Sequence, residues 1–139
     1  MARLAMTYPD AGAQVLYLRQ RSRELIRWLE IALAAARRLH DRQYEGAMLG
    51  NLGLAYKNLG EIRRAIQFCE EASLIEREIG DRRGEATALW NMSLVLYKLG
   101  ERTRAIQRTE QALTIFEQIE DPHAGMVRKQ LAAWREQTS

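Results

Sequence analysis

The fold is decided by residues 41–80, which read DRQYEGAMLGNLGLAYKNLGEIRRAIQFCEEASLIEREIG. They align without a gap on residues 81–120, DRRGEATALWNMSLVLYKLGERTRAIQRTEQALTIFEQIE, and 17 of the 40 positions are identical. A repeat of this length indicates stacked structural units, because each unit buries its apolar face against the next one. The chain is therefore predicted to be a repeat protein with an extended surface, of the kind that normally holds a partner.

Each 40-residue unit is predicted to form two helices. Apolar residues recur at a spacing of three and four over residues 49–59 and again over residues 65–79, which is the period of an α-helix. Gly60 and Gly100 follow the first helices, where glycine adopts the left-handed conformation that ends a helix at low cost. The predicted fold class is all-α, an α-solenoid of stacked antiparallel helical hairpins.

Aspartates recur at intervals of 40 residues where helices are expected to begin. Asp41, Asp81 and Asp121 can each accept a hydrogen bond from the free backbone N–H groups of the next helix. After Asp121 only one helix remains, and its polar residues outnumber its apolar ones, as expected of a cap. We interpret the chain as a single domain with a degenerate N-terminal repeat (1–40), two full repeats (41–80 and 81–120) and a capping helix (121–139).

The first 40 residues match the repeat only in their second half. Alignment of that half places four apolar residues on the buried stripe: Leu25, Leu29, Ala32 and Leu39. Pro9 and Gly12 fall where a first helix should run, and Gln20 replaces the turn glycine. We expect either a short first helix or one long helix from about Asp10 to His40. The long helix would leave an apolar side without a partner in the chain.

Composition excludes several classes of protein. The chain has 139 residues, and no apolar run approaches the roughly 20 residues that span a bilayer. The N-terminal residues lack the apolar core of a signal peptide. A single cysteine, Cys69, cannot form an intramolecular disulfide, which agrees with a reducing compartment. We expect a soluble protein of the cytoplasm that does not enter a membrane.

The charges are typical of solvated helix faces. The net charge of +3 comes from 21 basic and 18 acidic side chains that are interleaved along the chain. A nucleic-acid surface would need basic residues on one face with aromatic residues between them. Arg19, Arg21, Arg23 and Arg27 come closest, but no aromatic residues alternate with them. Nucleic acid is therefore a disfavoured partner.

The sequence contains no pattern that predicts catalysis or a cofactor. It has no glycine-rich phosphate loop, no nucleophile elbow and no HExxH motif. His40 and His123 have no further His or Cys near them and make a poor metal site. Cys69 falls on a buried stripe, which favours packing over a redox role. We expect no enzyme, no metal and no cofactor.

The repeat resembles the tetratricopeptide repeat. The resemblance rests on NLGLAYKNLGE at 51–61 and NMSLVLYKLGE at 91–101, each followed by an Ala-Ile pair and a later alanine. It is closest to the 40-residue variety of kinesin light chains, cell-polarity adaptors and bacterial signalling ATPases, and it covers residues 22–137. Ser93 and Leu96 depart from the pattern, where a glycine and a tyrosine are usual.

This resemblance implies that the first helix of each repeat lines a groove for a peptide or a helix. Asn51 and Asn91 match asparagines that bond the backbone of an extended peptide in related repeats, since a carboxamide both donates and accepts. Alternatively, each asparagine bonds a neighbouring helix, and the apolar stripe beside it is core. The partner-binding residues implied by the resemblance are Asn51, Leu54, Asn58, Trp90, Asn91, Leu94, Tyr97 and Lys98.

The leading hypothesis is a noncatalytic protein–protein interaction module, and two alternatives stay open. The N-terminal helix could dock on a second copy to form a homodimer, with Val15, Leu16, Leu18, Leu25 and Trp28 as interface residues. The repeats could also be the regulatory segment of a larger signalling protein, sensing a ligand for an attached ATPase or effector.

Overall fold

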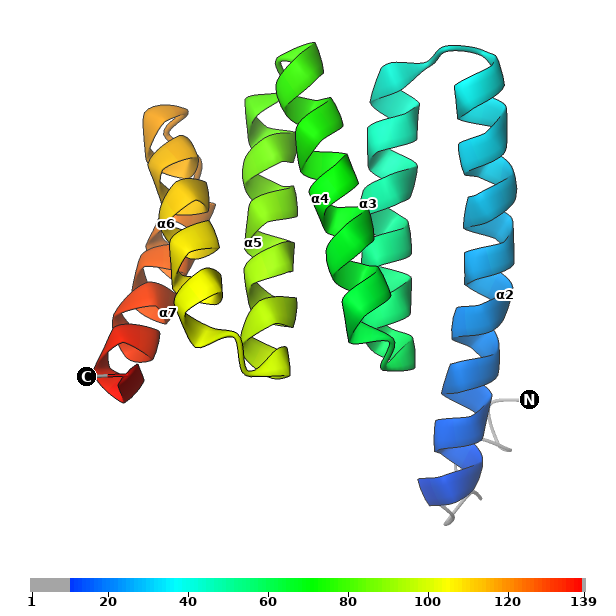
Figure 1. Cartoon of the computed structure of the whole chain (residues 1–139), viewed down its shortest axis with the longest axis horizontal. Coiled ribbons are helices and arrows are strands. Elements are labelled where there is room, and N and C mark those ends of the chain that lie inside the picture. Colours follow the sequence, from blue (N-terminus) through cyan, green and yellow to red (C-terminus); the bar gives the residue numbers. More distant parts are fainter. Residues whose placement is uncertain (1–10, 139) are drawn as a thin grey trace.

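The fold is a stack of antiparallel helices. The computed structural model describes residues 11–138, and the side chains of residues 19–137. All regular structure in residues 11–138 is helical: α2 (Ala11–Arg38), α3 (Arg42–Leu59), α4 (Ile62–Ile79), α5 (Arg82–Leu99), α6 (Arg102–Gln118) and α7 (His123–Thr138). Consecutive helices pack on one another, from α2 at one edge to α7 at the other (Figure 1). The predicted all-α solenoid is confirmed.

The helix ends follow the sequence signals. The Tyr44 N–H donates to Asp41 Oδ1 at 3.0 Å, and Asp81 caps α5 in the same way. Gly60 and Gly100 end α3 and α5 in the left-handed conformation, with φ of 90° and 95°. Each hairpin turn is therefore determined locally, and its two helices pack antiparallel.

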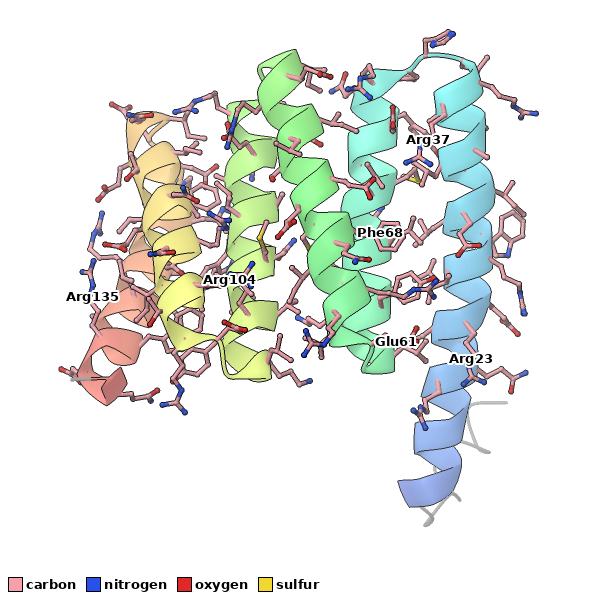
Figure 2. The ribbon with its side chains drawn as sticks, in the orientation of Figure 1. Arg23, Arg37, Glu61, Phe68, Arg104 and Arg135 are labelled. Atoms are coloured by element: carbon pink, nitrogen blue, oxygen red, sulfur yellow. The ribbon has the colours of Figure 1, made fainter. Side chains whose placement is uncertain are left out.

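The core runs through the whole stack. Buried residues of every helix contribute to it, and the largest that are fully buried include Leu49, Leu52, Met92, Leu96 and Phe116. Within the first full repeat, the Tyr56 ring of α3 stacks on Phe68 of α4 with centroids 5.2 Å apart; Phe68 is labelled in Figure 2. Burial of these stripes supplies most of the driving force for stacking.

Residues 11–38 of the N-terminal repeat form one long helix, which agrees with the second of the two expectations. The residues of α2 that face α3 are buried: Ile26, Leu29, Leu33 and Ala36. The burial predicted for Leu25 and Leu39 is wrong, because they are 49% and 78% exposed, and Ala32 is only half-buried. The counterparts of Leu25 in the complete repeats, Ala65 and Ala105, are fully buried, whereas those of Leu39 are partly exposed there too. The side chains of Val15, Leu16 and Leu18 lie outside the described residues.

Glycine allows a close approach between α3 and α4. A Cβ added at Gly53 would lie 2.7 Å from Cys69 Sγ and 3.4 Å from the Ala65 carbonyl oxygen. Cys69 is only 1% exposed, so its sulfur cannot move aside freely. Gly50 lies one turn earlier on α3, and a Cβ there would meet nothing within 4 Å. The two glycines therefore differ only in what surrounds them.

We expect Gly53→Ala to lower the free energy of unfolding by about 1 to 3 kcal/mol, because overpacking at the α3–α4 contact outweighs the gain in helix propensity. The matched change Gly50→Ala should raise it by about 0.5 to 1 kcal/mol, since alanine is the better helix former in open space. Urea denaturation of both variants measures the difference.

A double variant tests whether the sulfur is the obstacle. In a Cys69→Ala background the Sγ atom is gone, so Gly53→Ala should lose most of its cost. An unchanged cost in that background would contradict the contact between Gly53 and Cys69 as its cause.

Candidate functional site

The expected partner-binding residues lie on two neighbouring first helices, α3 and α5, which approach each other beside α4. Leu54, Leu94 and three others are half-buried, whereas Asn51, Asn58 and Lys98 are exposed. We call this set the groove row: Asn51, Leu54 and Asn58 of α3, with Trp90, Asn91, Leu94, Tyr97 and Lys98 of α5. The row contains a lysine and no carboxylate.

The two asparagines of the groove row occupy equivalent positions one repeat apart. Asn51 is exposed and Asn91 is half-buried. Neither carboxamide takes part in a hydrogen bond with another of the described side chains or with the described backbone. A carboxamide without an internal partner has its donor and acceptor available to a ligand. The helix-bonding alternative for these asparagines therefore has no contact to support it in residues 19–137.

The C-terminal end of the groove row is partly covered by α7. The Trp134 ring stacks on Tyr97 with centroids 4.3 Å apart and lies 6.2 Å from Trp90. The Tyr97 hydroxyl donates to Gln137, and Trp134 is 5% exposed. Trp90 and Tyr97 thus belong partly to the core, as the alternative interpretation of the apolar stripe had it. Leu94 lies one helical turn from both Trp90 and Tyr97, and, like Leu54 of α3, it is half-buried.

Trp134 is a neighbour of the groove row that the repeat pattern did not predict. Val127, Leu131 and Trp134 form a stripe at helical spacing, and all three are buried. A strict 40-residue offset aligns Trp134 with Leu94, a residue of the groove row. In α7 that position turns inward instead, because α7 places its one apolar stripe against the stack.

A shallow cleft opens at the other end of the groove row. It is lined by Arg21, Ser22, Glu24, Leu25 and Trp28 of α2 together with Asn58 of α3. Trp28 is 73% exposed, so the cleft is bordered by a large apolar surface. Leu25, on the same side of α2, is 49% exposed.

Buried carboxylates beside the groove row are structural. Glu45 accepts from Arg37 Nε at 3.2 Å, and Glu85, one repeat later, accepts from Arg77 Nε at 3.0 Å. Each glutamate also pairs with the arginine three residues before it. Charge-assisted hydrogen bonds satisfy both carboxylates, so they tie each hairpin to the preceding helix and are not free for chemistry.

The other reactive groups do not form a site. Burial raises the pKa of the Cys69 thiol to about 11, so the thiolate needed for reaction is scarce near neutrality. The backbone N–H and ring of His123 bond Asp121 and lower the pKa of that carboxyl. In the described part of the chain, no group of three or more His, Cys, Asp or Glu residues could hold a metal ion, and no helix there is long and apolar enough to cross a membrane.

Glu76 is the one buried carboxyl without an arginine partner in the described residues. It lies near the end of α4, where Gly46 of α3 and Gly84 of α5 leave room for its two oxygens. Its Oε2 has no hydrogen-bond partner within residues 19–137. Burial, and then the nearby Asp81 carboxylate, raise the pKa of Glu76 to about 7.

Comparisons with known proteins agree with this architecture. Residues 44–118, more than half of the chain, match the tetratricopeptide repeat family. The sequence matches no curated protein closely enough to count as a relative. Several solved structures are similar, however, and their sequence identities are low enough that they show the shared fold alone.

Three of these structures span a range of sizes. BtubC (BKLC) from P. vanneervenii superposes with a TM-score of 0.77 and 21% identity, over 99% of this chain and 61% of its own. The nearly identical TPR-like repeats assigned to a kinesin light chain of Podosopora anserina superpose with a TM-score of 0.71 and 17% identity. The match covers 88% of this chain and 62% of that structure's chain. The N-terminal domain of stress-induced protein-1 from C. elegans superposes with a TM-score of 0.59 and 18% identity. The match covers 82% of this chain and 97% of that structure's chain. The chain therefore spans less than two thirds of the first two.

We expect the free energy of unfolding to fall as the pH rises from about 4.5 to 7, because the folded state keeps Glu76 protonated over this range while the unfolded state ionises it. Glu76→Gln removes that ionisation. It should flatten this part of the pH profile and stabilise the protein by about 1 to 3 kcal/mol above pH 7.

The measurement is urea denaturation over a pH series, with Glu101→Gln as the control because Glu101 is exposed. A profile that keeps its slope in the Glu76→Gln variant would show that another group causes the pH dependence.

Proposed function

Because the chain belongs to the tetratricopeptide repeat family, whose members are generally noncatalytic and bind protein partners, we propose that it is an interaction module that holds a peptide or helix on the groove row. The observation that carries this proposal is the pair of unbonded carboxamides on Asn51 and Asn91. They recur at one repeat spacing on helix interiors, where asparagine has poor propensity. An internal structural role would require partners for them.

The groove row offers three kinds of contact to a ligand. Asn51 and Asn91 can each bond a peptide unit of an extended segment whatever its side chain. Leu54 and Leu94 provide apolar contact between them, and Lys98 favours a nearby acidic residue. The preferred ligand is therefore an extended peptide with an apolar anchor and a carboxylate toward the Lys98 end.

We expect the double variant Asn51→Ala/Asn91→Ala to bind such peptides about 5- to 150-fold more weakly, since it loses two hydrogen bonds that are each worth about 0.5 to 1.5 kcal/mol. The probe is a library of random dodecapeptides displayed on phage and selected against the whole chain. The affinities of the selected peptides are then measured by calorimetry for the wild type and the variant.

A matched control is available on the second helices. Gln67 and Gln107 are exposed amides that also lie one repeat apart, but on α4 and α6. Gln67→Ala/Gln107→Ala should leave affinity and helicity unchanged. Equal weakening in both double variants, or none in the asparagine variant, would remove the groove row from the proposal.

Two further roles have partial support. Self-association is favoured by the exposure of Leu25 and Trp28, which no other described helix covers. A role as the regulatory segment of a larger signalling protein agrees with the chain's spanning 61% and 62% of two similar structures. A cytoplasmic setting suits the free, buried Cys69.

A further inference from the structure

The stack has two edges, and they differ in charge. Because consecutive helices are antiparallel, the N-terminal halves of α2, α4 and α6 lie at the same edge as the C-terminal halves of α3, α5 and α7 (Figure 1). The half of the stack at this edge carries 12 basic and seven acidic residues and comprises residues 19–30, 51–70, 91–110 and 131–137. The other half carries eight basic and ten acidic residues and comprises residues 31–50, 71–90 and 111–130. Positive charge is therefore concentrated at one edge.

In the other half, carboxylates of the chain itself hold most of the basic residues. Six of the eight lie within 3.3 Å of an Asp or Glu oxygen: Arg37, Arg42, Arg77, Arg82, Arg83 and Arg128. Several of these pairs join one helix to the next, as Arg128 of α7 does with Glu117 of α6 at 2.7 Å. Only Arg38 and Lys129 of this half form no ion pair with a described residue.

At the first edge, most of the basic residues have no such partner. Arg64, Arg104 and Arg135 pair with carboxylates at 3.9, 3.7 and 2.8 Å. The other nine form no ion pair with any described residue, and seven of them are exposed. One of the seven, Lys98, belongs to the groove row, and the remaining six are all arginines. We call these six the basic edge: Arg19, Arg21, Arg23 and Arg27 of α2, Arg63 of α4 and Arg102 of α6.

The helices that begin at this edge gain no stability from these arginines. α4 and α6 have no acidic residue in the first turn, and neither Glu61 nor Glu101 caps the backbone through its side chain. By contrast, α3 and α5 begin at the opposite edge with a bonded aspartate and carry a glutamate in the first turn. A cation near a helix N-terminus opposes the helix dipole. Arg63 and Arg102 therefore lie where a positive charge is unfavourable for the helix itself.

The basic edge lies apart from the groove row. Its arginines belong to α2, α4 and α6, whereas the groove row belongs to α3 and α5. In Figure 2, Arg23 of α2 lies near the level of Glu61 in the α3–α4 turn, so the arginines of α2 reach the same edge as those of α4. Arg23 and Arg63 also occupy equivalent positions one repeat apart. The basic edge thus follows the stack from α2 to α6.

We propose that the basic edge binds an acidic polypeptide segment of a partner protein. A guanidinium pairs with a carboxylate through two parallel N–H···O bonds, and these six arginines form no hydrogen bond or ion pair with a described residue. The Arg102 guanidinium lies 5.2 Å from the centroid of the Tyr97 ring, which orients it. This surface is a second contact site, so the proposal does not rest on the function proposed for the groove row.

The carboxylates at the same edge favour a polypeptide over a nucleic acid. Glu24, Glu61 and Glu101 lie among the arginines and are exposed. A nucleic-acid duplex carries one phosphate charge per about 1.7 Å of its axis, so phosphates would also come against these carboxylates. An acidic segment can place its carboxylates opposite the arginines and neutral residues opposite the glutamates. The mixture of charges therefore suits a partner whose own charges are spaced apart.

The test uses the whole chain and a fluorescein-labelled peptide in which Glu-Glu-Gly-Ser is repeated five times. Fluorescence anisotropy should show binding that weakens about tenfold as NaCl rises from about 50 to about 300 mM, because salt screens exposed charges. In about 100 mM NaCl, Arg23→Glu/Arg63→Glu should weaken binding about 5- to 30-fold, since two exposed ion pairs are lost and two repulsions replace them.

A matched control comes from the other half of the stack. Arg38 and Lys129 are exposed and form no ion pair with a described residue, so Arg38→Glu/Lys129→Glu changes the net charge by the same amount. It should weaken binding less than about threefold, because charges more than about 10 Å from the peptide are largely screened at this salt concentration. Both variants replace exposed side chains, and their helicity by circular dichroism should match the wild type.

Equal weakening in the two charge variants would show that only net charge matters, and it would overturn the proposal. So would the absence of measurable peptide binding, or tighter binding of a mixed-sequence DNA duplex than of the peptide at the same salt concentration. Failure here is distinct from failure of the groove function. Asn51→Ala/Asn91→Ala should leave the affinity for this acidic peptide unchanged, and a loss in that variant would place the peptide on the groove row instead.

Discussion

Each helix in the interior of this stack has to bury apolar side chains on two sides, and the rest of the structure depends on that requirement. α4 meets it by packing between α3 and α5, and α5 by packing between α4 and α6. Because each helix is covered by the next one, the apolar core would continue for as long as further helices were added. The two ends of the chain must solve the problem differently, and they do.

At the C-terminal end, α7 has one apolar stripe and turns it inward. Val127, Leu131 and Trp134 are buried, and the Trp134 ring closes over Tyr97 and Trp90 of α5. At the N-terminal end, α2 keeps two apolar sides and covers only one. The difference between one stripe and two explains why α7 covers its end of the stack while α2 leaves an apolar side exposed.

Some polar residues of the stack are buried inside it, and others are open to solvent. Glu45 and Glu85 are buried and bonded by arginines at equivalent positions. Glu76 is buried without such an arginine, and its burial and the nearby Asp81 raise its pKa. Asn51 is exposed and Asn91 half-buried, and neither is bonded to another described residue, so their carboxamides are open to solvent and to the ligand that we propose.

The sequence by itself determined the repeat and the helices of the two full repeats. It also determined the aspartates that precede α3, α5 and α7 and the glycine turns after α3 and α5, because these depend on residues within a few positions of one another. For the N-terminal repeat, Pro9, Gly12 and Gln20 left two expectations open, a short first helix or one long helix. Only the tertiary structure decided which apolar stripe is covered. Leu25 follows the buried pattern yet is exposed, and Trp134 turns inward over the groove row. Such outcomes depend on how a helix is rotated and on which neighbours it has, and a repeat spacing does not record either.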